Sequence, residues 1–521
     1  MLAIKYRKSF PKALCELSWP RSCYTANFGS APLCKNLKMC FTKSSTATTF
    51  TRLYTSLSQS SMRPAKHSIS NVNSQIKNKI LSTGPISISE FMKYALTSPI
   101  GGYYTKDNVF GKQGDFITSP EISQMFGEVI GIWYIMQWQA RGCPENVELI
   151  ELGPGKGSLL GDILRISQRF HKFQESIKRV HFIEKSAVLR KTQAKTLLCD
   201  LSTDSSCILD KNNMDAPVSA KSGYGNIQVC WENNIDAVSI NSNSMTMIMA
   251  HEFFDAIPIY RFELGDYGWS EVLIDVADES SHKTPLNNQS NSNPLGSYPL
   301  KDSLLNKPTY TSYTLADGKL KVKDSLNNFE NHYNSSKQNN LEFKFVKTKR
   351  PTANSDAFLT NLEFDRKFET GSSIEISPES GYIAQKISEI VEKTNGAALI
   401  VDYGQNYPQA TTFRGISKHK FVNPLINPGT IDLTADVDFA YLAKSVSKIA
   451  NCFGPIEQGD FLHAMGIQDR LKQLLNKTKE RNMQENLISS YKRLVDHEAM
   501  GKIYKFFAIT PKSQINPPIP F

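Results

Sequence analysis

Apolar and polar residues alternate in blocks along most of the chain after about Gly84, and these blocks predict strands and helices in turn. Short apolar runs typical of buried strands occupy Val147–Leu152, Val180–Glu184, Ile227–Trp231, Met245–Ala250 and Ala397–Gly404. Helical spacing of apolar residues follows the first two runs, over Ser158–Phe170 and Ala187–Leu198. Because strands that alternate with helices usually form a parallel sheet, the pattern predicts an α/β fold.

An N-terminal helical extension precedes this alternation. Ile86–Pro99 has a Ser-x-Glu helix start followed by helical apolar spacing. A second helix is predicted after Thr118, with Ser119 as its N-cap and Pro120 at its first position. Its most apolar part, Met125–Trp138, carries Glu128, which predicts a buried or amphipathic helix.

Two segments interrupt the α/β pattern. Two strand-like runs flank a Gly-containing turn within Arg261–Val276, which predicts a β-hairpin extension. Residues 278–340 are rich in Asn, Ser, Lys and Pro, and their low apolar content cannot offset the entropy cost of ordering. We therefore predict a long disordered surface insertion inside one domain of residues 84–521. After it, Ser377-Pro378-Glu379 starts a predicted helix that runs to about Lys393.

The net charge of +10 belongs to the N-terminus. Met1–Ser89 contains 13 basic residues and one acidic residue, which leaves 47 basic and 49 acidic residues in the rest of the chain. A leader that is basic, rich in Ser and Thr and almost free of acids predicts a mitochondrial transit peptide over about residues 1–60, and hence the matrix. The alternative is a basic arm that binds nucleic acid or partners. The nearly neutral body does not predict nucleic-acid binding.

Membrane and metal classes are not indicated by the sequence. No segment approaches the run of about 18 apolar residues that a membrane helix requires, so no membrane span is predicted. Four of the nine cysteines lie in the leader, and the other five form no C-x-x-C pair. The sequence therefore predicts neither a metal site nor a disulfide framework. It predicts that the protein works in a reducing compartment.

The stretch VELIELGPGKGSLLGDILR places Gly153, Gly155 and Gly157 directly after the strand that carries Glu151. Glycines there allow a tight strand-to-helix turn and close approach of a ligand to the backbone. A dinucleotide fingerprint would need Gly or Ala at position 158, where this chain has Ser158. The pattern instead resembles motif I of class I S-adenosylmethionine (SAM) methyltransferases.

Five stretches occur in a characteristic order: GDFITSPEISQMFGE, ELGPGKGSLLGDIL, AHEFFDAIP, IVDYG and PGTIDLTADVDF. Together they resemble the MidA-like family of mitochondrial protein arginine methyltransferases, which are complex I assembly factors. The resemblance covers the chain from about Gly84 to its C-terminus, apart from the insertion. It implies a Rossmann-like class I SAM-dependent methyltransferase in the matrix. It also implies symmetric (type II-like) dimethylation of an arginine in a core subunit of NADH:ubiquinone oxidoreductase (complex I), and allows a homodimer.

The resemblance also assigns the site. We expect contacts to SAM from the glycine turn, from the acid that ends the second strand, and from flanking residues: Glu151, Gly153, Gly155, Gly157, Glu184, Asp115, Thr118 and Trp231. An arginine acceptor is a permanent cation, so carboxylates must hold its guanidinium. We predict Glu252 as the primary guanidinium contact and Asp255 as its support. The alternative makes Asp255 a helix N-cap and Glu252 a solvated loop residue.

The stretch Asp432–Phe439 predicts a further helix start, with Asp436 and Asp438 in its first turn. Many members of the resembling family carry His where this chain has Asp436, so no catalytic role is assigned to that position.

Three classes of function remain open at this stage. The first is the arginine methyltransferase. The second is a methyltransferase of the same fold that acts on a small molecule or lipid, which stays open because a fold does not decide the acceptor. The third is a non-catalytic assembly chaperone that keeps the fold as a binding surface. A nicotinamide dehydrogenase is disfavoured by Ser158.

Overall fold

A computed structural model describes most of the domain and not the leader. The described residues are 71–105, 118–200, 218–225, 227–277, 298–299, 311–316, 319–324, 341–359 and 368–521. The predicted transit peptide at 1–60 and the predicted cofactor contact Asp115 lie outside them. None of the helices among the described residues combines the length and apolarity needed to cross a membrane.

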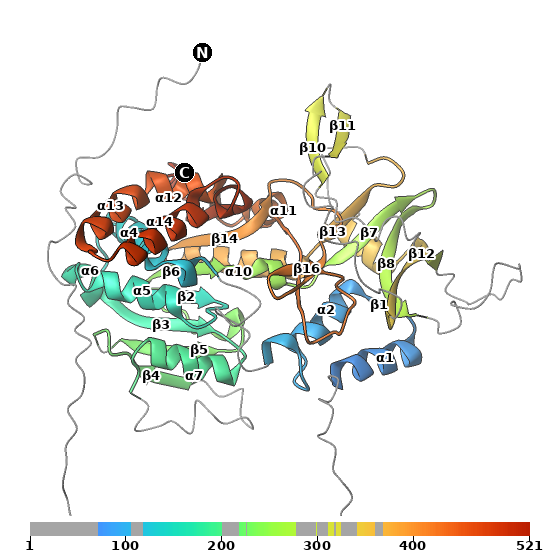
Figure 1. Cartoon of the computed structure of the whole chain (residues 1–521), viewed down its shortest axis with the longest axis horizontal. Helices are drawn as coiled ribbons and strands as arrows, with labels where there is room; N and C mark the ends of the chain where they lie inside the picture. The colour runs from blue at the N-terminus through green and yellow to red at the C-terminus, as the bar shows by residue number, and fades with distance from the viewer. Residues whose placement is uncertain are drawn as a thin grey trace, which may run out of the picture. The chain divides into compact units, whose positions relative to one another are not determined.

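A nine-stranded sheet forms the centre of the α/β part (Figure 1). Its order is β19 (Asn451–Glu457), β20 (Tyr504–Thr510), β14 (Ala397–Gln405), β6 (Met245–His251), β2 (Val147–Leu152), β3 (Ile177–Ile183), β5 (Gln228–Glu232) and β4 (Val218–Lys221), with β18 (Val437–Asp438) beside β14. The run β14-β6-β2-β3-β5 is parallel, while β4, β19 and β20 are antiparallel to their neighbours. The five predicted strands and their parallel arrangement are confirmed.

Helices cover both faces of this sheet. The connections through α5 (Ser158–Ser167) and α7 (Ala187–Thr196) run one way along the sheet, and the connection through α10 (Pro378–Lys393) runs the other way. Because such crossovers are right-handed, the two groups lie on opposite faces. α10 and α11 (Phe439–Val446) bury Ile387 and Leu442 against the apolar side chains of β2, β6 and β14.

Two predicted helix starts are wrong in detail. Ser119 is not an N-cap: Thr118 has that position, and α3 (Ser119–Ile122) lasts one turn. The extended Ser123 then breaks the helix, and its hydroxyl accepts the Met125 N–H to cap α4 (Gln124–Ala140).

The segment Asp432–Phe439 differs from its prediction in the same way. It opens with β17 (Asp432–Thr434), which pairs with β15 (Arg414–Ser417), so the backbone is extended where a helix was predicted. The helix α11 begins only after Asp438, whose carboxylate accepts the Tyr441 N–H.

A six-stranded antiparallel sheet adjoins the α/β part in sequence. The predicted hairpin is confirmed as β7 (Tyr260–Gly265) and β8 (Gly268–Val276). It is flanked by β13 (Ser373–Ile376), β12 (Phe343–Pro351), β9 (Tyr298–Pro299) and β1 (Ile86–Ser87). Val276 pairs with Phe343, so the predicted insertion leaves and rejoins this sheet at adjacent points. Most of the insertion lies outside the described residues, apart from β9, β10 (Thr311–Ala316) and β11 (Lys319–Asp324).

Two N-terminal helices pack on this second sheet. The predicted helix α2 (Ile88–Thr97) is confirmed, and the hydroxyl of Ser87 accepts the Glu90 N–H at its start. A further helix, α1 (Asn71–Thr83), lies before the point at which the sequence analysis began the domain. Both helices bury apolar residues, among them Ile76 and Phe91, in one core with the apolar face of β8 and β12.

The remaining described elements are η2 (Tyr103–Thr105), α6 (His171–Ser176), η3 (Ile235–Ala237), η4 (Phe254–Ala256), α9 (Ala353–Leu359), β16 (Lys420–Val422), α12 (Gln458–Ala464), α13 (Ile467–Lys477), α14 (Arg481–Val495) and α15 (Met500–Ile503). The helices α12 to α15 lie between β19 and β20 in sequence. Figure 1 shows α12, α13 and α14 gathered beside α4.

A buried ion pair joins these C-terminal helices to α4. Glu128 and Arg470 are both 1% exposed, and the guanidinium donates to the carboxylate at 2.6 and 3.0 Å. Arg165 adds a third contact to Glu128 at 3.2 Å. A carboxylate in the apolar helix α4 is tolerated because Arg470 compensates its charge from another element.

We expect Arg470→Ala to lower the free energy of unfolding by about 3–5 kcal/mol, because it leaves the Glu128 carboxylate buried without its main partner. Urea denaturation followed by tryptophan fluorescence measures this change. Lys472→Ala, which removes the exposed ion pair with Asp469, is the matched control and should leave the unfolding curve unchanged. Equal effects of the two substitutions on the free energy of unfolding would contradict the stabilising role assigned to the buried Glu128–Arg470 pair.

Candidate functional site

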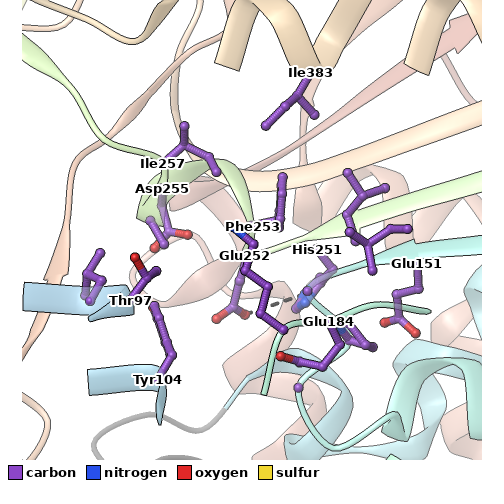
Figure 2. A pocket seen from close by; sticks show the side chains of 18 of the residues that line it. Thr97, Tyr104, Glu151, Glu184, His251, Glu252, Phe253, Asp255, Ile257 and Ile383 are labelled. Atoms are coloured by element: carbon purple, nitrogen blue, oxygen red, sulfur yellow. Dashed lines mark ion pairs between the residues drawn. The ribbon is translucent and has the colours of Figure 1, made fainter. Parts of the chain in front are cut away.

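The order of the parallel strands reverses between β2 and β6. From β2 the chain builds β3 and β5 on one side, and then β6 and β14 on the other. Ligands of open α/β sheets bind at such a switch point, outside the carboxyl ends of the strands. A cavity of about 550 Å³ opens there, lined by the loops that follow β2, β3 and β6 and by residues of α2 and α10 (Figure 2).

The three glycines of the turn after β2 all have left-handed backbones. Their φ angles are 63° at Gly153, 52° at Gly155 and 76° at Gly157. A Cβ at Gly153 would approach the ring of Phe253 to 2.9 Å, whereas at Gly155 it would meet no described atom within 4 Å. Gly153 and Gly155 line the cavity, and Gly157 sits outside it as the N-cap of α5. The turn therefore brings the bare backbone of Gly153 and Gly155 to the cavity wall, whereas Gly157, also a predicted cofactor contact, does not line it.

Glu184 lines the cavity at the end of β3, and Gln193 holds it in place. Its carboxylate accepts the Ser186 N–H at 2.7 Å and the Gln193 amide at 3.2 Å. The same amide donates to the Gly155 carbonyl at 2.7 Å. Burial raises the pKa of the Glu184 carboxyl to about 7. One glutamine thus ties the acid to the glycine turn.

Trp231, a predicted cofactor contact, does not line the cavity as described. Its side chain is fully buried, and its indole N–H donates to the Gln193 side chain at 2.9 Å. Trp231 therefore supports Gln193 from behind. Sequence reasoning missed Gln193, because a helical glutamine carries no motif signal of its own.

Glu151, at the end of β2, also lines the cavity. Its side chain is 3% exposed, and one carboxylate oxygen finds no hydrogen-bond partner among the described residues. Burial raises the pKa of this carboxyl to about 8. A buried carboxylate oxygen without a donor is suited to a ligand that carries N–H, O–H or positive charge.

Glu252 follows β6 and is not the solvated loop residue of the alternative prediction. Its side chain is 9% exposed and lines the cavity. The carboxylate accepts the Ser119 N–H at 3.4 Å and lies 3.5 Å from Nε2 of His251. Burial, and next the charge of Asp255, raise the pKa of Glu252 to about 8. Burial lowers the pKa of His251 to about 3, so this imidazole is neutral and does not compensate the charge of Glu252 when that carboxyl ionises.

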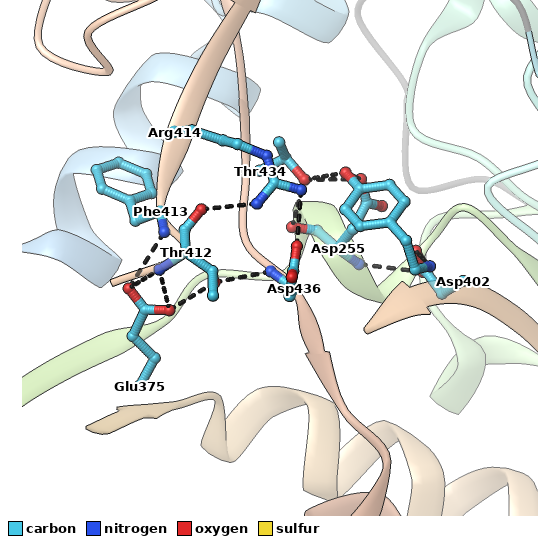
Figure 3. A network of polar contacts seen from close by, with 9 residues as sticks. Asp255, Glu375, Asp402, Thr412, Phe413, Arg414, Thr434 and Asp436 are labelled. Atoms are coloured by element: carbon cyan, nitrogen blue, oxygen red, sulfur yellow. Dashed lines mark hydrogen bonds and ion pairs between the residues drawn. The ribbon is translucent and has the colours of Figure 1, made fainter. Parts of the chain in front are cut away.

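Asp255 lies in the short helix η4, and its side chain does not act as an N-cap. The carboxylate accepts hydrogen bonds from the hydroxyls of Tyr403 and Thr434 (Figure 3). Arg414 stacks on the ring of Tyr403 at 5.2 Å and pairs with Asp436 at 2.7 Å. Burial raises the pKa of Asp255, and the two hydroxyls oppose that shift. Asp255 thus lines the cavity but is anchored by its own network.

Carboxyl groups dominate the cavity wall. Seven carboxylates line it: Glu151, Glu184, Asp236, Glu252, Asp255, Glu379 and Asp432. The three lysines of the wall are Lys93, Lys156 and Lys185. Lys93 pairs with Glu379 at 3.1 Å, and Lys156 pairs with Glu121 at 3.1 Å. The remaining excess of buried carboxylates favours a cationic ligand.

The wall beside α2 contains residues that sequence reasoning did not assign. The hydroxyl of Tyr104 donates to Asp432 at 2.9 Å, and both line the cavity. Asp432 belongs to a quoted motif, whereas Tyr104 gave no signal. The predicted contact Thr118 also lines the cavity. The first N–H of the helix after it, from Ser119, is directed at Glu252.

Within the described residues, one group has the composition of a metal site: His181, Cys230 and Glu232 on β3 and β5. Nδ1 of His181 already contacts the Glu232 carboxylate at 2.8 Å, and Nε2 lies 3.6 Å from Glu148. These carboxylates raise the pKa of His181 despite burial, so an ion pair accounts for the group without a metal.

Comparisons with known proteins agree with this geometry. A family model of S-adenosyl-L-methionine-dependent methyltransferases matches residues 129–456. The chain is 35% identical over 441 residues to the mitochondrial protein arginine methyltransferase NDUFAF7 of Bos taurus, with 84% of this chain and 83% of the relative covered. The Homo sapiens protein of that name is 34% identical over 454 residues, with 87% and 86% covered. The Drosophila melanogaster homologue is 34% identical, with 84% of each chain covered.

A crystal structure of a Burkholderia thailandensis protein bound to S-adenosyl-homocysteine has the same fold. The TM-score is 0.57 at 18% identity, and 84% of this chain and 91% of that chain are covered. At this identity the likeness shows the fold alone, and it confirms the predicted Rossmann-like class I architecture. The chain belongs to the MidA-like family of S-adenosyl-L-methionine-dependent methyltransferases, as its ordered motifs indicated.

Proposed function

We propose that this protein transfers a methyl group from SAM to an arginine side chain of a protein substrate. The observation that carries the proposal is the excess of buried carboxylates in a cavity at the switch point of the sheet, with Glu252 at its wall. Both reactants are cations at the reacting centre, one a sulfonium and the other a guanidinium. A wall of carboxylates lowers the free energy of both.

The residues at the glycine turn fit SAM. The space beside Gly155 admits a ligand against bare backbone, and we assign Glu184, which lines the same cavity, to accept hydrogen bonds from ribose hydroxyls. One carboxylate oxygen of Glu151 has no partner among the described residues. This oxygen can contact a cationic or N–H-bearing part of the ligand. Thr118 is the last of the proposed SAM contacts among the described residues. Asp115, outside them, keeps its predicted role as a SAM contact. SAM, when bound, supplies an electrophilic methyl group.

Glu252 is our candidate for the residue that holds the acceptor. A guanidinium presents N–H donors in a rigid fork, and a carboxylate accepts two of them side by side. This fixes the attacking nitrogen in line with the methyl group, which is the main demand of such a displacement. Asp255 supports the site by its charge while its carboxylate stays bound to Tyr403 and Thr434.

The proposed compartment and protein substrate are inferred from the names of the relatives. Their name is mitochondrial protein arginine methyltransferase, and the basic leader of this chain fits import into the matrix. We infer that residues 1–60 act as a transit peptide. We infer further that the acceptor arginine lies in a core subunit of complex I and becomes symmetrically dimethylated. Methylation of isolated complex I subunits, read by mass spectrometry, tests this; transfer only to small molecules would favour the second class of function.

We expect Gly155→Val to abolish SAM binding, with at least a 100-fold loss of affinity, because a β-branched side chain would fill the ligand space and strain the left-handed backbone. Calorimetric titration with SAM, and separately with NAD, measures it, and NAD should not bind the unsubstituted protein. Gly142→Val is the matched control: its φ is 77°, its Cβ would also meet no described atom within 4 Å, and it lies away from the cavity. A folded protein that never binds SAM would favour the chaperone class.

We expect Glu252→Gln to lower the methyl-transfer rate to an arginine peptide by about 100- to 1,000-fold, because it removes a charge that is aligned with the guanidinium. The affinity for SAM should stay within about twofold, since the cofactor contacts are elsewhere. Glu379→Gln, on the α10 rim and already paired with Lys93, is the control. A Glu252→Gln enzyme with a normal rate would remove Glu252 from the mechanism.

We expect kcat/KM for the arginine acceptor to rise with pH and to level off above about pH 8. Burial raises the pKa of Glu252 to about 8, and only its ionised form attracts the guanidinium. Protonation therefore weakens acceptor binding as the pH falls through this value. A pH–rate profile of Glu252→Gln should lack this limb; an unchanged limb would assign it to another group.

A further inference from the structure

We propose that Asp402, at the end of β14, is a positioning residue that sets the orientation of Glu252 toward the acceptor. This inference rests on the proposed role of Glu252 and adds a residue to which the sequence analysis gave no role. Asp402 belongs to the IVDYG stretch and is 0% exposed. It is not among the residues that line the cavity as described, so it acts through the loop beside it.

The carboxylate of Asp402 is surrounded by backbone donors. Its Oδ2 accepts the N–H groups of Phe253 at 3.2 Å, Phe254 at 3.0 Å and Asp255 at 3.2 Å. Its Oδ1 accepts the N–H of Tyr403 at 2.9 Å. Consecutive N–H groups that converge on one point form a nest, and here the Asp402 carboxyl fills it; burial raises the pKa of that carboxyl, and the backbone donors oppose the shift. Figure 3 shows Asp402 beside the loop that carries Asp255.

This arrangement accounts for the backbone of Glu252. Its φ is 50°, in the left-handed region that a glutamate rarely adopts. The N–H of Glu252 itself donates to the Val401 carbonyl at 2.9 Å. The peptide groups on both sides of Glu252 are thus bonded to β14, by a carbonyl before it and by the Asp402 carboxylate after it. Because both of these peptide groups are bonded to β14, the chain changes direction at Glu252. This change of direction points the Glu252 side chain into the cavity.

The next residue of β14 anchors the other end of the same loop. The hydroxyl of Tyr403 donates to the Asp255 carboxylate. Asp402 therefore holds the loop by its backbone, and Tyr403 holds it by a side chain. Both restraints come from a strand that pairs with β6 in parallel, with Val401 opposite His251. Such double anchoring keeps the Glu252 carboxylate in one place relative to the methyl donor.

Asp402→Asn is the decisive variant, because the amide has nearly the same shape but can accept at only one of its two positions. Either Tyr403 or the three loop N–H groups then face an NH₂ donor. We expect kcat for an arginine peptide to fall about 100-fold, since a displacement of about 1 Å at the reacting centre has that effect. The dissociation constant of SAM should stay within about twofold, because the glycine turn is unaffected.

Asp438→Asn is the matched control. Asp438 is also an aspartate whose carboxylate accepts a backbone N–H, from Tyr441 at 2.9 Å, but it lies away from the cavity wall. Its substitution should leave kcat unchanged. In a Glu252→Gln background, Asp402→Asn should add little further loss, since it acts through a residue already removed. Full additivity would overturn the proposal, and so would a parallel loss of SAM binding, melting temperature and kcat, which marks a merely structural role.

A readout without acceptor separates this inference from the proposed function. The carboxyl carbon of Glu252, followed by ¹³C NMR titration, should titrate near its raised pKa in the unsubstituted protein and in Asp438→Asn. In Asp402→Asn, and also in Tyr403→Phe, which loosens the same loop without removing a carboxyl, its pKa should move toward the ordinary value of a glutamate as the carboxyl leaves its buried position. An unchanged titration overturns the positioning role. If this shift is seen while no arginine peptide is methylated, the positioning role stands and the arginine acceptor is wrong.

Discussion

The cost of burying carboxylates is the constraint around which this site is built. Each negative charge taken out of water loses hydration and must find donors or a cation. The protein meets this demand in different ways. Asp402 takes backbone N–H groups, Asp255 takes two hydroxyls, and Glu184 takes an N–H and an amide. Burial raises the pKa of all these acids, but Glu151 keeps one carboxylate oxygen without a hydrogen-bond partner among the described residues, and the N–H of Ser119 reaches Glu252 only at 3.4 Å. These two are the positions at which a cationic ligand gains most.

The sheet explains why these acids meet. Glu151 lies near the carboxyl end of β2, Glu184 and Glu252 directly follow β3 and β6, and these parallel strands end at one edge. The reversal of strand order between β2 and β6 leaves that edge open between the connecting loops. The proposed cofactor and acceptor sides of the cavity therefore lie on adjacent strands. The family match and the fold of the solved bacterial protein are consistent with this shared architecture.

Residues that do not line the cavity hold the lining residues in position. Trp231 fixes Gln193, and Gln193 joins the glycine turn to Glu184. On the other side, β14 holds the loop after β6. In the proposed function, these two sets of contacts hold the cofactor side and the acceptor side of the cavity in fixed positions, which methyl transfer requires of a protein. The Glu128–Arg470 pair performs a similar task for the C-terminal helices, because each charge is tolerated only while the other is present.

The sequence alone determined the parallel strands, the hairpin, α2 and α10, and it pointed to the glycine turn, Glu184 and Glu252. These features follow from local pattern: apolar runs, capping residues, and a backbone that only glycine adopts easily. Tertiary structure decided the rest. The break at Ser123 and the strand at Asp432 depend on pairing and capping partners that a local pattern does not reveal. Trp231 proved to support Gln193, Tyr104 lines the cavity, and Asp402 accepts hydrogen bonds from the loop after β6, because hydrogen bonds between residues far apart in the chain depend on how the sheet is assembled.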